Sequence, residues 1–457
     1  MNLSQLRQAL TETRVLPVKT LGQNFLHDQN LVRWIVSQAQ IQSNDFVVEI
    51  GPGFGALTAE LLRGGARVLA LEKDLRLVSF LRETFSGARL EVQHCDALRF
   101  DPRVLFAEHN VKLIGNLPYY IASQLLLHFL SLPSPIELAL LMLQDEMARR
   151  LSATPRSPEY GALTLKVQSH YSVEYLRKIP ASVFFPRPEV ASALVRFAPR
   201  SPDQLENCDY HIFRELVRLG FSQRRKQLGK LLAHRCPDWE NMAGKLGVSP
   251  FARAEELSRE QWIELSNLIE DCEKKSPADS ASEIFPVVDE NDREIGRAPR
   301  AEVHANNLRH RAVHILVFNR AGEVLLQKRS RFKDRHPLLW DSSAAGHVEA
   351  GETYDQTAAR ELHEELGVTA KLTLITTISA SERTGHEFIH LYRAECDGLF
   401  SVPRNEISAV VFFPPGIVER WIANKPEEFA PGFLECWKIS QRSARAGGTP
   451  TCQVESD

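Results

Sequence analysis

Three kinds of segment are missing from this 457-residue sequence. No apolar run approaches the ~20 residues that a membrane-spanning helix needs, and residues 1–20 contain no apolar core of a secretory signal. The seven cysteines are scattered without a C-x-x-C pair, so neither a disulfide framework nor a zinc site is expected. These absences predict a cytoplasmic protein with no membrane-embedded part.

Net charge is also small, −3 at pH 7, so the overall balance does not indicate a nucleic-acid partner. The length exceeds that of one ordinary domain. Residues 273–283 are polar, without large aliphatic side chains, which is typical of a linker. We therefore expect folded parts over residues 1–272 and 284–440, a disordered tail over residues 441–457, and a monomer.

A glycine-rich turn between residues 47 and 58 organises the first part. The sequence V-V-E-I-G-P-G-F-G-A-L-T predicts a strand, a turn that begins at Gly51, and the start of a helix. Glycine in such a turn lets the backbone approach a ligand closely. Glu72 ends a second apolar run, where a carboxylate can bind both hydroxyls of a ribose. The pattern predicts a nucleoside-containing cofactor, and a dinucleotide is the commonest alternative.

The next motifs favour a methyl donor over a dinucleotide. Asp96 ends a third strand-like run, and residues 111–120, V-K-L-I-G-N-L-P-Y-Y, give an apolar strand that ends in Asn-Leu-Pro-Tyr. This order of motifs is typical of methyltransferases. It would place the nucleoside of S-adenosylmethionine across the strand tips, with Glu72 on the ribose and Asp96 on the adenine amine.

Three motifs together resemble the rRNA adenine N6,N6-dimethyltransferase family of the small-subunit type: G-Q-N-F-L at 22–26, the glycine turn, and N-L-P-Y at 116–119. The resemblance implies a Rossmann-like, S-adenosylmethionine-dependent methyltransferase domain over residues 1–200 and a small helical RNA-binding subdomain over 201–272. It implies two adjacent adenosines of a small-subunit rRNA hairpin loop as substrate, in an immature 30S-type subunit. The implied cofactor-binding residues are Asn24, Leu26, Gly51, Glu72, Asp96 and Asn116.

Asn116 to Tyr119 are expected to carry the chemistry. The exocyclic amine of adenine is a poor nucleophile, because its lone pair is delocalised into the ring. Acceptors that hold its hydrogens would draw that lone pair out of conjugation. The side-chain oxygen of Asn116 and the carbonyl of Leu117, fixed by the rigid Pro118, are suited to this role. Tyr119 would stack on the base, whereas Tyr120 is expected to be a core aromatic.

A proline-pinned segment, residues 179–197, resembles the F-x-P-x-P-x-V-x-S segment of the same family. The resemblance places Phe184 against the target base, opposite Tyr119. Phe185 is the competing choice, and a packing role is open for both.

Residues 213–235 contain seven lysines and arginines against a single glutamate, in a stretch that we expect to be helical. A solvated helix face is the usual interpretation of such a run. Its centre, F-S-Q-R-R-K, resembles a conserved segment of the dimethyltransferases. That favours phosphate contacts by Arg224, Arg225 and Lys226.

The second part centres on residues 346–368, where a helix is predicted to end at Gly367. Glu361, Glu364 and Glu365 share one face of this helix. They would repel one another unless a divalent cation neutralised them, and oxygen ligands suit Mg²⁺ or Mn²⁺.

The same stretch fills every position of the Nudix box, G-x5-E-x7-R-E-U-x-E-E-x-G-U. This resemblance implies an α/β/α sandwich that hydrolyses a small molecule containing a diphosphate. Glu361 and Glu365 would bind metal, Glu364 would act as a further ligand or as a base, and Arg360 would orient the glutamates.

The flanking sequence resembles the Nudix branch close to isopentenyl diphosphate isomerase. That isomerase carries a catalytic cysteine just before a Ser-His pair. Here residues 344–347, A-A-G-H, occupy that place without a thiol, so isomerisation is not expected. His310, His336 and His347 are expected to be structural or surface residues rather than ligands.

Three other functions stay open on the sequence alone. These are an antibiotic-resistance methyltransferase of the large subunit, a non-catalytic RNA-binding relative, and a Nudix hydrolase for which the first part is an RNA tether.

Overall fold

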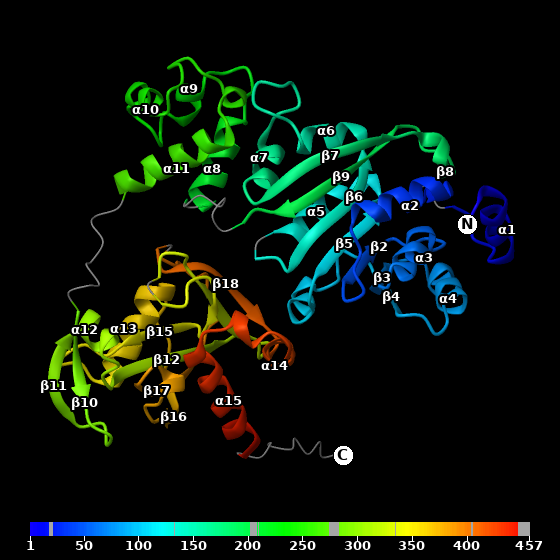
Figure 1. Cartoon of the computed structure of the whole chain (residues 1–457). Helices are drawn as coiled ribbons and strands as arrows, with labels where there is room; N and C mark the ends of the chain where they lie inside the picture. The colour runs from blue at the N-terminus through cyan, green and yellow to red at the C-terminus, as the bar shows by residue number, and fades with distance from the viewer. Residues whose placement is uncertain are drawn as a thin grey trace, which may run out of the picture. The chain divides into compact units, whose positions relative to one another are not determined.

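The computed structural model describes residues 1–17, 22–131, 133–201, 208, 210–273, 283–333, 335–403 and 405–446. The chain divides into two compact units, Met1–Lys275 and Ser276–Asp457 (Figure 1). Among the described helices, none combines the length and the apolar character that a membrane span requires.

A seven-stranded sheet forms the centre of the first unit, in the order β4-β3-β2-β5-β6-β9-β7 (Figure 1). The five strands from β4 to β6 are parallel to one another, and β9 is antiparallel to both of its neighbours, β6 and β7. This doubly wound arrangement brings the carboxyl ends of β2, β3 and β5 to one edge of the sheet. The strands are β2 (Phe46–Ile50), β3 (Arg67–Glu72), β4 (Leu90–His94), β5 (Val111–Asn116), β6 (Ile136–Gln144), β7 (Tyr171–Ile179) and β9 (Ser192–Pro199).

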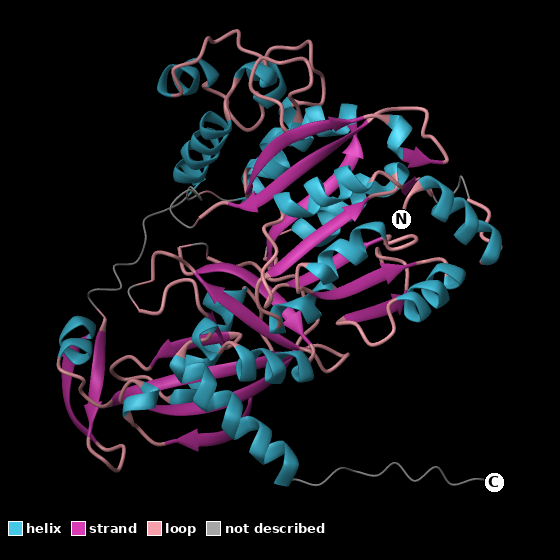
Figure 2. Cartoon of the chain, turned by 45° about the vertical axis from the view of Figure 1, so that its right-hand side comes forward, coloured by secondary structure: helices cyan, strands magenta, loops and turns pink. Residues whose placement is uncertain are grey.

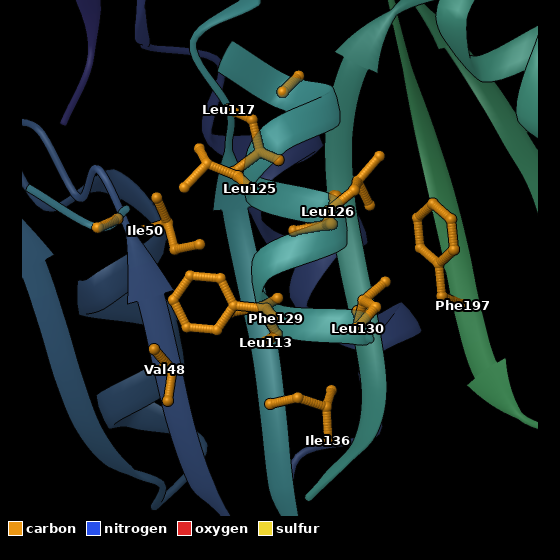
Figure 3. Packing of buried hydrophobic residues seen from close by; sticks show 14 of the residues in the cluster. Val48, Ile50, Leu113, Leu117, Leu125, Leu126, Phe129, Leu130, Ile136 and Phe197 are labelled. Atoms are coloured by element: carbon orange, nitrogen blue, oxygen red, sulfur yellow. The ribbon is translucent and has the colours of Figure 1, made fainter. Parts of the chain in front are cut away.

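Apolar side chains cover both faces of this sheet, as expected for buried parallel strands. Val48 belongs to a core with Phe129 of α5, whereas its neighbour Val47 packs with Ile35 of α2 on the opposite face. Figure 3 shows the first of these layers, with the side chains of α5 lying over those of β2 and β5. The helices are α2 (Gln29–Gln38), α3 (Ala56–Arg63), α4 (Leu75–Thr84), α5 (Ala122–Leu130), α6 (Asp145–Leu151) and α7 (Ala162–Gln168).

Two small elements lie near the edge of the sheet at which β2, β3 and β5 end. The strand β1 (Phe25–Leu26) pairs antiparallel with β8 (Phe184–Phe185). The N-terminal helix α1 (Leu3–Glu12) packs against Phe25 and Phe54 in a separate apolar cluster. The G-Q-N-F-L segment is thereby held between the glycine turn and the proline-pinned segment.

A helical subdomain with its own core completes the first unit, and Trp262 lies at its centre, fully buried. The basic stretch 213–235 is not one helix, because residues 221–226 form turns and bends between α8 and α9. The R-R-K triplet therefore lies in a loop, and this corrects the helical expectation. The helices are α8 (Tyr210–Gly220), α9 (Leu228–Leu232), α10 (Trp239–Lys245) and α11 (Arg259–Glu273).

A second seven-stranded sheet forms the other unit, and its central strand β12 pairs in parallel with β17 and antiparallel with β13 and β15. The helix α13 (Tyr354–Leu366) packs on this sheet through Ala358, Leu362 and Leu366. Figure 2 shows helices around this sheet. The strands are β12 (His310–Phe318), β13 (Val324–Arg329), β14 (Trp340–Asp341), β15 (Ala344–His347), β16 (Thr373–Ile378), β17 (Glu387–Glu395) and β18 (Ile407–Phe413).

The remaining elements of this unit are a hairpin, β10 (Ile284–Val288) with β11 (Glu294–Pro299), and the helices α12 (Arg300–Ala305), α14 (Pro415–Asn424) and α15 (Pro431–Ala446). The helix α15 runs to Ala446. Residues 441–446, expected to belong to a disordered tail, are thus helical. Residues 447–457, and residues 274–282 of the expected linker, lie outside the described residues.

Candidate active sites

The first site is a pocket at the carboxyl ends of β2, β3 and β5. Its lining comes from the G-Q-N-F-L segment, the glycine turn, and the tips of these strands. All of the residues expected to bind the cofactor line this one pocket: Asn24, Leu26, Gly51, Glu72, Asp96 and Asn116.

The glycine turn and Glu72 form one hydrogen-bonded unit at the pocket floor. Gly51 adopts a left-handed conformation with φ of +64°, which L side chains rarely adopt, so glycine fits this turn. One oxygen of Glu72 accepts from the backbone of Gly53 at 3.2 Å, and the other accepts from Lys73 and Asp74 at 2.8 and 2.9 Å. Burial raises the pKa of Glu72, and these three donors oppose the rise. The carboxylate is fixed in position before any ribose arrives.

Asp96 lies at the rim of the pocket with both oxygens engaged. It accepts from the Lys73 ammonium at 2.7 Å and from the backbone of Leu98 at 3.1 Å. The pairing with Lys73 lowers the pKa of this carboxyl. Asp96 is therefore an ionised acceptor, which suits an adenine amine.

Asn116 ends β5 and links two motifs that are far apart in sequence. Its side-chain nitrogen donates to the backbone carbonyl of Asn24 at 2.9 Å. Among the described residues no donor reaches its side-chain oxygen, which leaves that oxygen available to a substrate amine. Leu117 follows, is buried, and donates its backbone N–H to Met142 at 3.2 Å.

The positions of Tyr119 and Tyr120 relative to the pocket differ from those expected. Tyr119 is not among the pocket-lining residues, and its hydroxyl shares a 2.6 Å hydrogen bond with Ser192 of β9. Tyr120, expected to be a core aromatic, is 57% exposed and lines the pocket, so that prediction is wrong. Pro118 begins a turn of 3-10 helix at this point, and consecutive side chains of such a turn diverge.

Phe184 lies in the apolar core with only 2% of its surface exposed, alongside Leu26 and Met142. In this conformation it offers no face to a base. Phe185 is half-buried and packs near Phe25 instead. The contact of Phe184 with the target base therefore stays a prediction, and the packing alternative fits its present position.

Glu49 and Cys95 also line the pocket, and the sequence motifs predicted no role for either. Glu49 is fully buried and accepts from the Thr58 hydroxyl at 2.6 Å. Burial raises its pKa to about 7. A glutamate inside an otherwise apolar strand, V-V-E-I, was the available signal. Cys95 is a half-buried free thiol, and burial raises its pKa.

The R-R-K loop divides into an anchor and two free cations. Arg224 donates to the carbonyls of Pro158 and Tyr160 at 2.7 and 2.9 Å and lies 3.5 Å from Glu255. Arg225 and Lys226 are exposed and pair with no described residue. Arg225 and Lys226 are therefore the two cations of this loop that an anionic ligand can reach.

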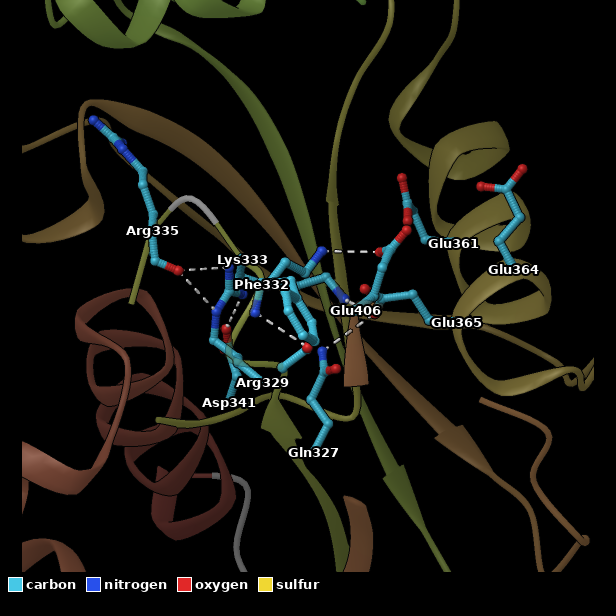
Figure 4. A network of polar contacts seen from close by, with 12 residues as sticks. Gln327, Arg329, Phe332, Lys333, Arg335, Asp341, Glu361, Glu364, Glu365 and Glu406 are labelled. Carbon is cyan, nitrogen blue, oxygen red and sulfur yellow. Dashed lines mark hydrogen bonds and ion pairs between the residues drawn. The ribbon is translucent and has the colours of Figure 1, made fainter. Parts of the chain in front are cut away.

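The second site lies where α13 faces β15. Glu365 is buried and accepts from the backbone of Ala345 at 2.9 Å and from Gln327 at 3.2 Å. Glu361 lies one turn before it, directly against Gly346, where an added Cβ would come 2.0 Å from its carboxylate oxygen. Figure 4 shows the carboxylates of Glu361 and Glu365 converging, while Glu364 points away from them.

Arg360 acts as the expected organiser of this acidic helix. It donates twice to Glu352 at 3.0 Å, to Glu361 at 2.8 Å, and to Glu364 at 2.9 Å. Glu364 is the most exposed of the three box glutamates expected to bind metal. The structure thus brings Glu361 and Glu365 together and places Glu364 at the edge of the group.

The electrostatics of this pair fit a cation site. Burial, together with the charge of Glu365, raises the pKa of Glu361, and burial raises that of Glu365. Lys333, whose ammonium lies 2.9 Å from Glu406, is the nearby positive charge that favours ionised Glu365. Two neighbouring carboxyls that resist ionisation become good oxygen ligands when a divalent ion is bound.

A histidine cluster lies in the same unit. Nitrogens of His304, His310 and His347 lie within 4.8 Å of one another, and Glu387 comes within 3.3 Å of His347. The Phe285 ring stacks on His347 with centroids 4.7 Å apart, so the cluster also serves as aromatic packing. This donor set would suit a transition metal. His310 and His347 thus combine the expected packing role with a geometry that could hold an ion.

The family model for ribosomal RNA adenine dimethylase matches residues 18–271, and the model for the NUDIX domain matches residues 308–433. The chain belongs to the ribosomal RNA adenine dimethylase family. We therefore call Met1–Lys275 the dimethylase unit and Ser276–Asp457 the Nudix unit.

The dimethylase unit is similar to proteins named ribosomal RNA small subunit methyltransferase A. The one from Chlorobium phaeobacteroides is 42% identical over 253 residues, covering 55% of this chain and 94% of that protein. The one from Prosthecochloris aestuarii is 46% identical over 216 residues, covering 47% and 81%. A dimethyladenosine transferase from Plasmodium falciparum is 25% identical, with a TM-score of 0.45, covering 54% of this chain and 98% of that one.

These findings confirm both resemblances, to the dimethylases and to the Nudix proteins, and the Rossmann-like and Nudix fold classes. They also confirm that both units are of enzymatic families.

Proposed function

We propose that the dimethylase unit transfers methyl groups from S-adenosylmethionine to N6 of two adjacent adenosines in a small-subunit rRNA hairpin loop, during subunit assembly in the cytoplasm. The relatives named small subunit methyltransferase A support this choice over a large-subunit target. The observation that carries it is the convergence of the expected cofactor residues on one pocket, with Asn116 at its edge.

The pocket residues fit the donor by their chemistry. Glu72 supplies a fixed carboxylate for the ribose, Asp96 an ionised acceptor for the adenine amine, and the glycine turn a backbone surface without side chains. When bound, S-adenosylmethionine supplies a methyl group on a positively charged sulfur. The pocket needs no group that neutralises this charge, because it is lost as the methyl group leaves.

Asn116 is the residue of this chain that positions the target amine for methyl transfer. Its side-chain nitrogen is held by Asn24, so the opposite oxygen is oriented to accept from the target amine. The Leu117 carbonyl accepts the second hydrogen, and Pro118 restricts the backbone there. Holding these hydrogens aligns the nitrogen lone pair for in-line attack, and much of the rate gain comes from this positioning. Each transfer forms a nitrogen–carbon bond as the carbon–sulfur bond breaks, and the nitrogen then releases one proton to water. In the second transfer only one hydrogen remains to be held.

Tyr120 supplies the exposed aromatic surface at the mouth of the pocket. We propose it as a contact for the extruded base or its neighbour, together with Tyr119 and Phe184 if their side chains reorient. Arg225 and Lys226 contact RNA phosphates, because both are exposed and unpaired among the described residues.

The Nudix unit is proposed to hydrolyse a small molecule that contains a diphosphate, with Mg²⁺ or Mn²⁺ held by Glu361 and Glu365. Glu364 serves as an outer ligand or as the base. When bound, the ion supplies positive charge that neutralises the diphosphate. Ala345 offers only a backbone N–H to this site, and that N–H fixes Glu365. A hydrolase fits better than an isomerase, because no thiol is present at this position.

Primer extension on rRNA from a deletion strain tests the first activity. We expect the small-subunit loop to lose its dimethyladenosines and to regain them from a plasmid copy. Modification that persists without another responsible enzyme would refute the assignment. Loss confined to large-subunit RNA would favour the antibiotic-resistance alternative.

Glu365→Gln tests the independence of the two activities. We expect Mg²⁺-dependent hydrolysis of nucleoside diphosphate compounds to disappear while rRNA methylation continues at the wild-type rate. Loss of both activities in this variant would contradict two separate sites.

A further inference from the structure

A second cleft in the dimethylase unit lies away from the cofactor pocket. Its lining residues belong to or adjoin α5, α7, the start of β7, and α8. Figure 1 shows these elements where the sheet meets the helical subdomain. The cleft has a volume of about 230 Å³. None of its lining residues belongs to the cofactor pocket or to the R-R-K loop. The described lining residues are Leu126, Leu127, Leu130, Ser131, Lys166, Val167, His170, Tyr171 and Arg214.

The two charged side chains among the described lining residues, Lys166 and Arg214, are both positive. Lys166 and Arg214 are exposed, and neither pairs with a carboxylate among the described residues. Among the described residues that line the cleft there is no aspartate or glutamate. Two unpaired cations beside a concave surface favour a ligand that carries negative charge.

His170 supplies an independent signal at the same place. His170 is buried, with 6% of the residue exposed, and its ring packs on that of Tyr210 with centroids 4.2 Å apart. Its Nδ1 has no hydrogen-bond partner among the described residues. A buried polar atom without a partner is costly and calls for an explanation. Burial and the charge of Arg214 lower the pKa of His170 to about 3, so the ring is neutral and can donate one N–H.

The opposite wall is apolar and comes from three leucines of α5. Such a wall accommodates the sugar or base edge that accompanies a phosphate, and an isolated inorganic ion would leave it unused. We infer that this cleft binds a phosphate group, through Lys166, Arg214 and the His170 ring, and that the phosphate belongs to the RNA backbone outside the methylated loop. This inference rests on the proposed rRNA substrate.

A double variant, Lys166→Gln with Arg214→Gln, tests the charge contribution in the full-length protein. Both side chains are exposed, so folding is expected to be unaffected. We expect affinity for a small-subunit RNA fragment to fall about tenfold, and the slope of log K against log salt to fall by about 1–2. S-adenosylmethionine affinity should not change.

The matched control removes two exposed arginines from other surfaces of the unit, with Arg33→Gln and Arg63→Gln. We expect it to retain most of its RNA affinity. An equal loss in this control would overturn the inference, because general electrostatics would then explain both results.

His170 provides a direct readout. Its ring resonance in ¹³C-histidine-labelled protein is assigned by its absence in His170→Gln, and is followed during titration with inorganic phosphate, adenosine monophosphate, or the RNA fragment. A shift with RNA alone supports a backbone phosphate. A shift with all three probes supports the phosphate site but assigns it to free phosphates as well.

No shift with any probe would overturn the inference. The result is separable from the methylation activity. If the protein methylates RNA but the His170 resonance does not shift with any probe, the phosphate site in the cleft is refuted and the proposed function is not. A protein that fails to methylate but whose His170 responds to phosphate refutes the proposed substrate and leaves the phosphate site standing.

Discussion

The side chain of Asn116 donates to the backbone carbonyl of Asn24 at 2.9 Å, across 92 positions of sequence. Two short motifs, one before the first sheet strand and one at the end of β5, thus meet at the cofactor pocket. The bond selects which end of the Asn116 amide faces the substrate. The orientation of the Asn116 amide is in this way set by a segment that lies far from it in sequence and also lines the pocket.

Asn116→Ala should abolish methylation while largely sparing the cofactor. The variant removes the oxygen that holds the target amine, but the contacts of Glu72 and Asp96 remain. We expect the S-adenosylmethionine dissociation constant to rise less than tenfold, which corresponds to ~1.4 kcal/mol. Calorimetric titration and a methyl-transfer assay measure the two effects. Asn30→Ala on α2 is the control, and a larger rise in the constant would assign Asn116 mainly to cofactor binding.

Gly346→Ala should inactivate the Nudix unit. An added Cβ would lie 2.0 Å from a carboxylate oxygen of Glu361, so the glutamate must move out of position. We expect a loss of about 1–3 kcal/mol in stability from overpacking, together with loss of metal-dependent hydrolysis. Gly416→Ala on α14, where an added Cβ meets nothing within 4 Å, is the matched control. Normal hydrolysis in Gly346→Ala would refute the proposed geometry.

The Nudix unit should respond to pH and metal together. The folded pKa of Glu361 and of Glu365 is raised above the ordinary glutamate value of 4.5. The folded state then binds protons more tightly than the unfolded state. The free energy of unfolding without metal should therefore fall as pH rises from that value through the raised pKa.

Thermal unfolding with and without Mg²⁺ measures this effect. Because the ion binds the ionised carboxylates, its stabilisation should be larger at about pH 8.5 than at about pH 6. Glu365→Gln should flatten the dependence. Equal stabilisation at both pH values in the unmodified protein would contradict a site made of these two glutamates.

Different residues of the R-R-K loop should contribute to stability and to RNA binding. Arg224→Ala should lower the stability of the dimethylase unit by about 1 kcal/mol, because its hydrogen bonds to Pro158 and Tyr160 are lost. The double change Arg225→Gln and Lys226→Gln should leave stability unchanged, weaken RNA binding, and lower the salt slope by about 1–2. Thermal unfolding and salt-dependent binding distinguish the two variants. Identical behaviour would refute this division of roles.

Short motifs predicted the cofactor pocket because each of its parts is local. The glycine turn, Glu72 and Asp96 lie at strand ends, and the parallel order of the strands brings those ends together. The acidic face of α13 was equally predictable from the sequence, since three glutamates at helical spacing must lie on one side. Both fold classes followed from these same segments.

The features that the sequence could not settle concern side chains whose direction depends on distant partners. Tyr119 and Tyr120 are adjacent and chemically alike, so only the bond from Tyr119 to Ser192 of β9 decides which one turns away from the pocket. Phe184 is buried because β8 pairs with β1, a contact between segments far apart in sequence. The anchoring of Arg224 depends on the carbonyls of Pro158 and Tyr160, which are also distant in sequence.

Cys95 gives the cofactor pocket a feature of use in inhibitor design. It is a free thiol on the pocket wall, beside Asp96. Since burial and neighbouring carboxylates raise its pKa, it should react slowly with general alkylating reagents. A nucleoside analogue that carries a mild electrophile would be held next to this sulfur, so covalent capture would depend on recognition by the pocket and not on intrinsic thiol reactivity.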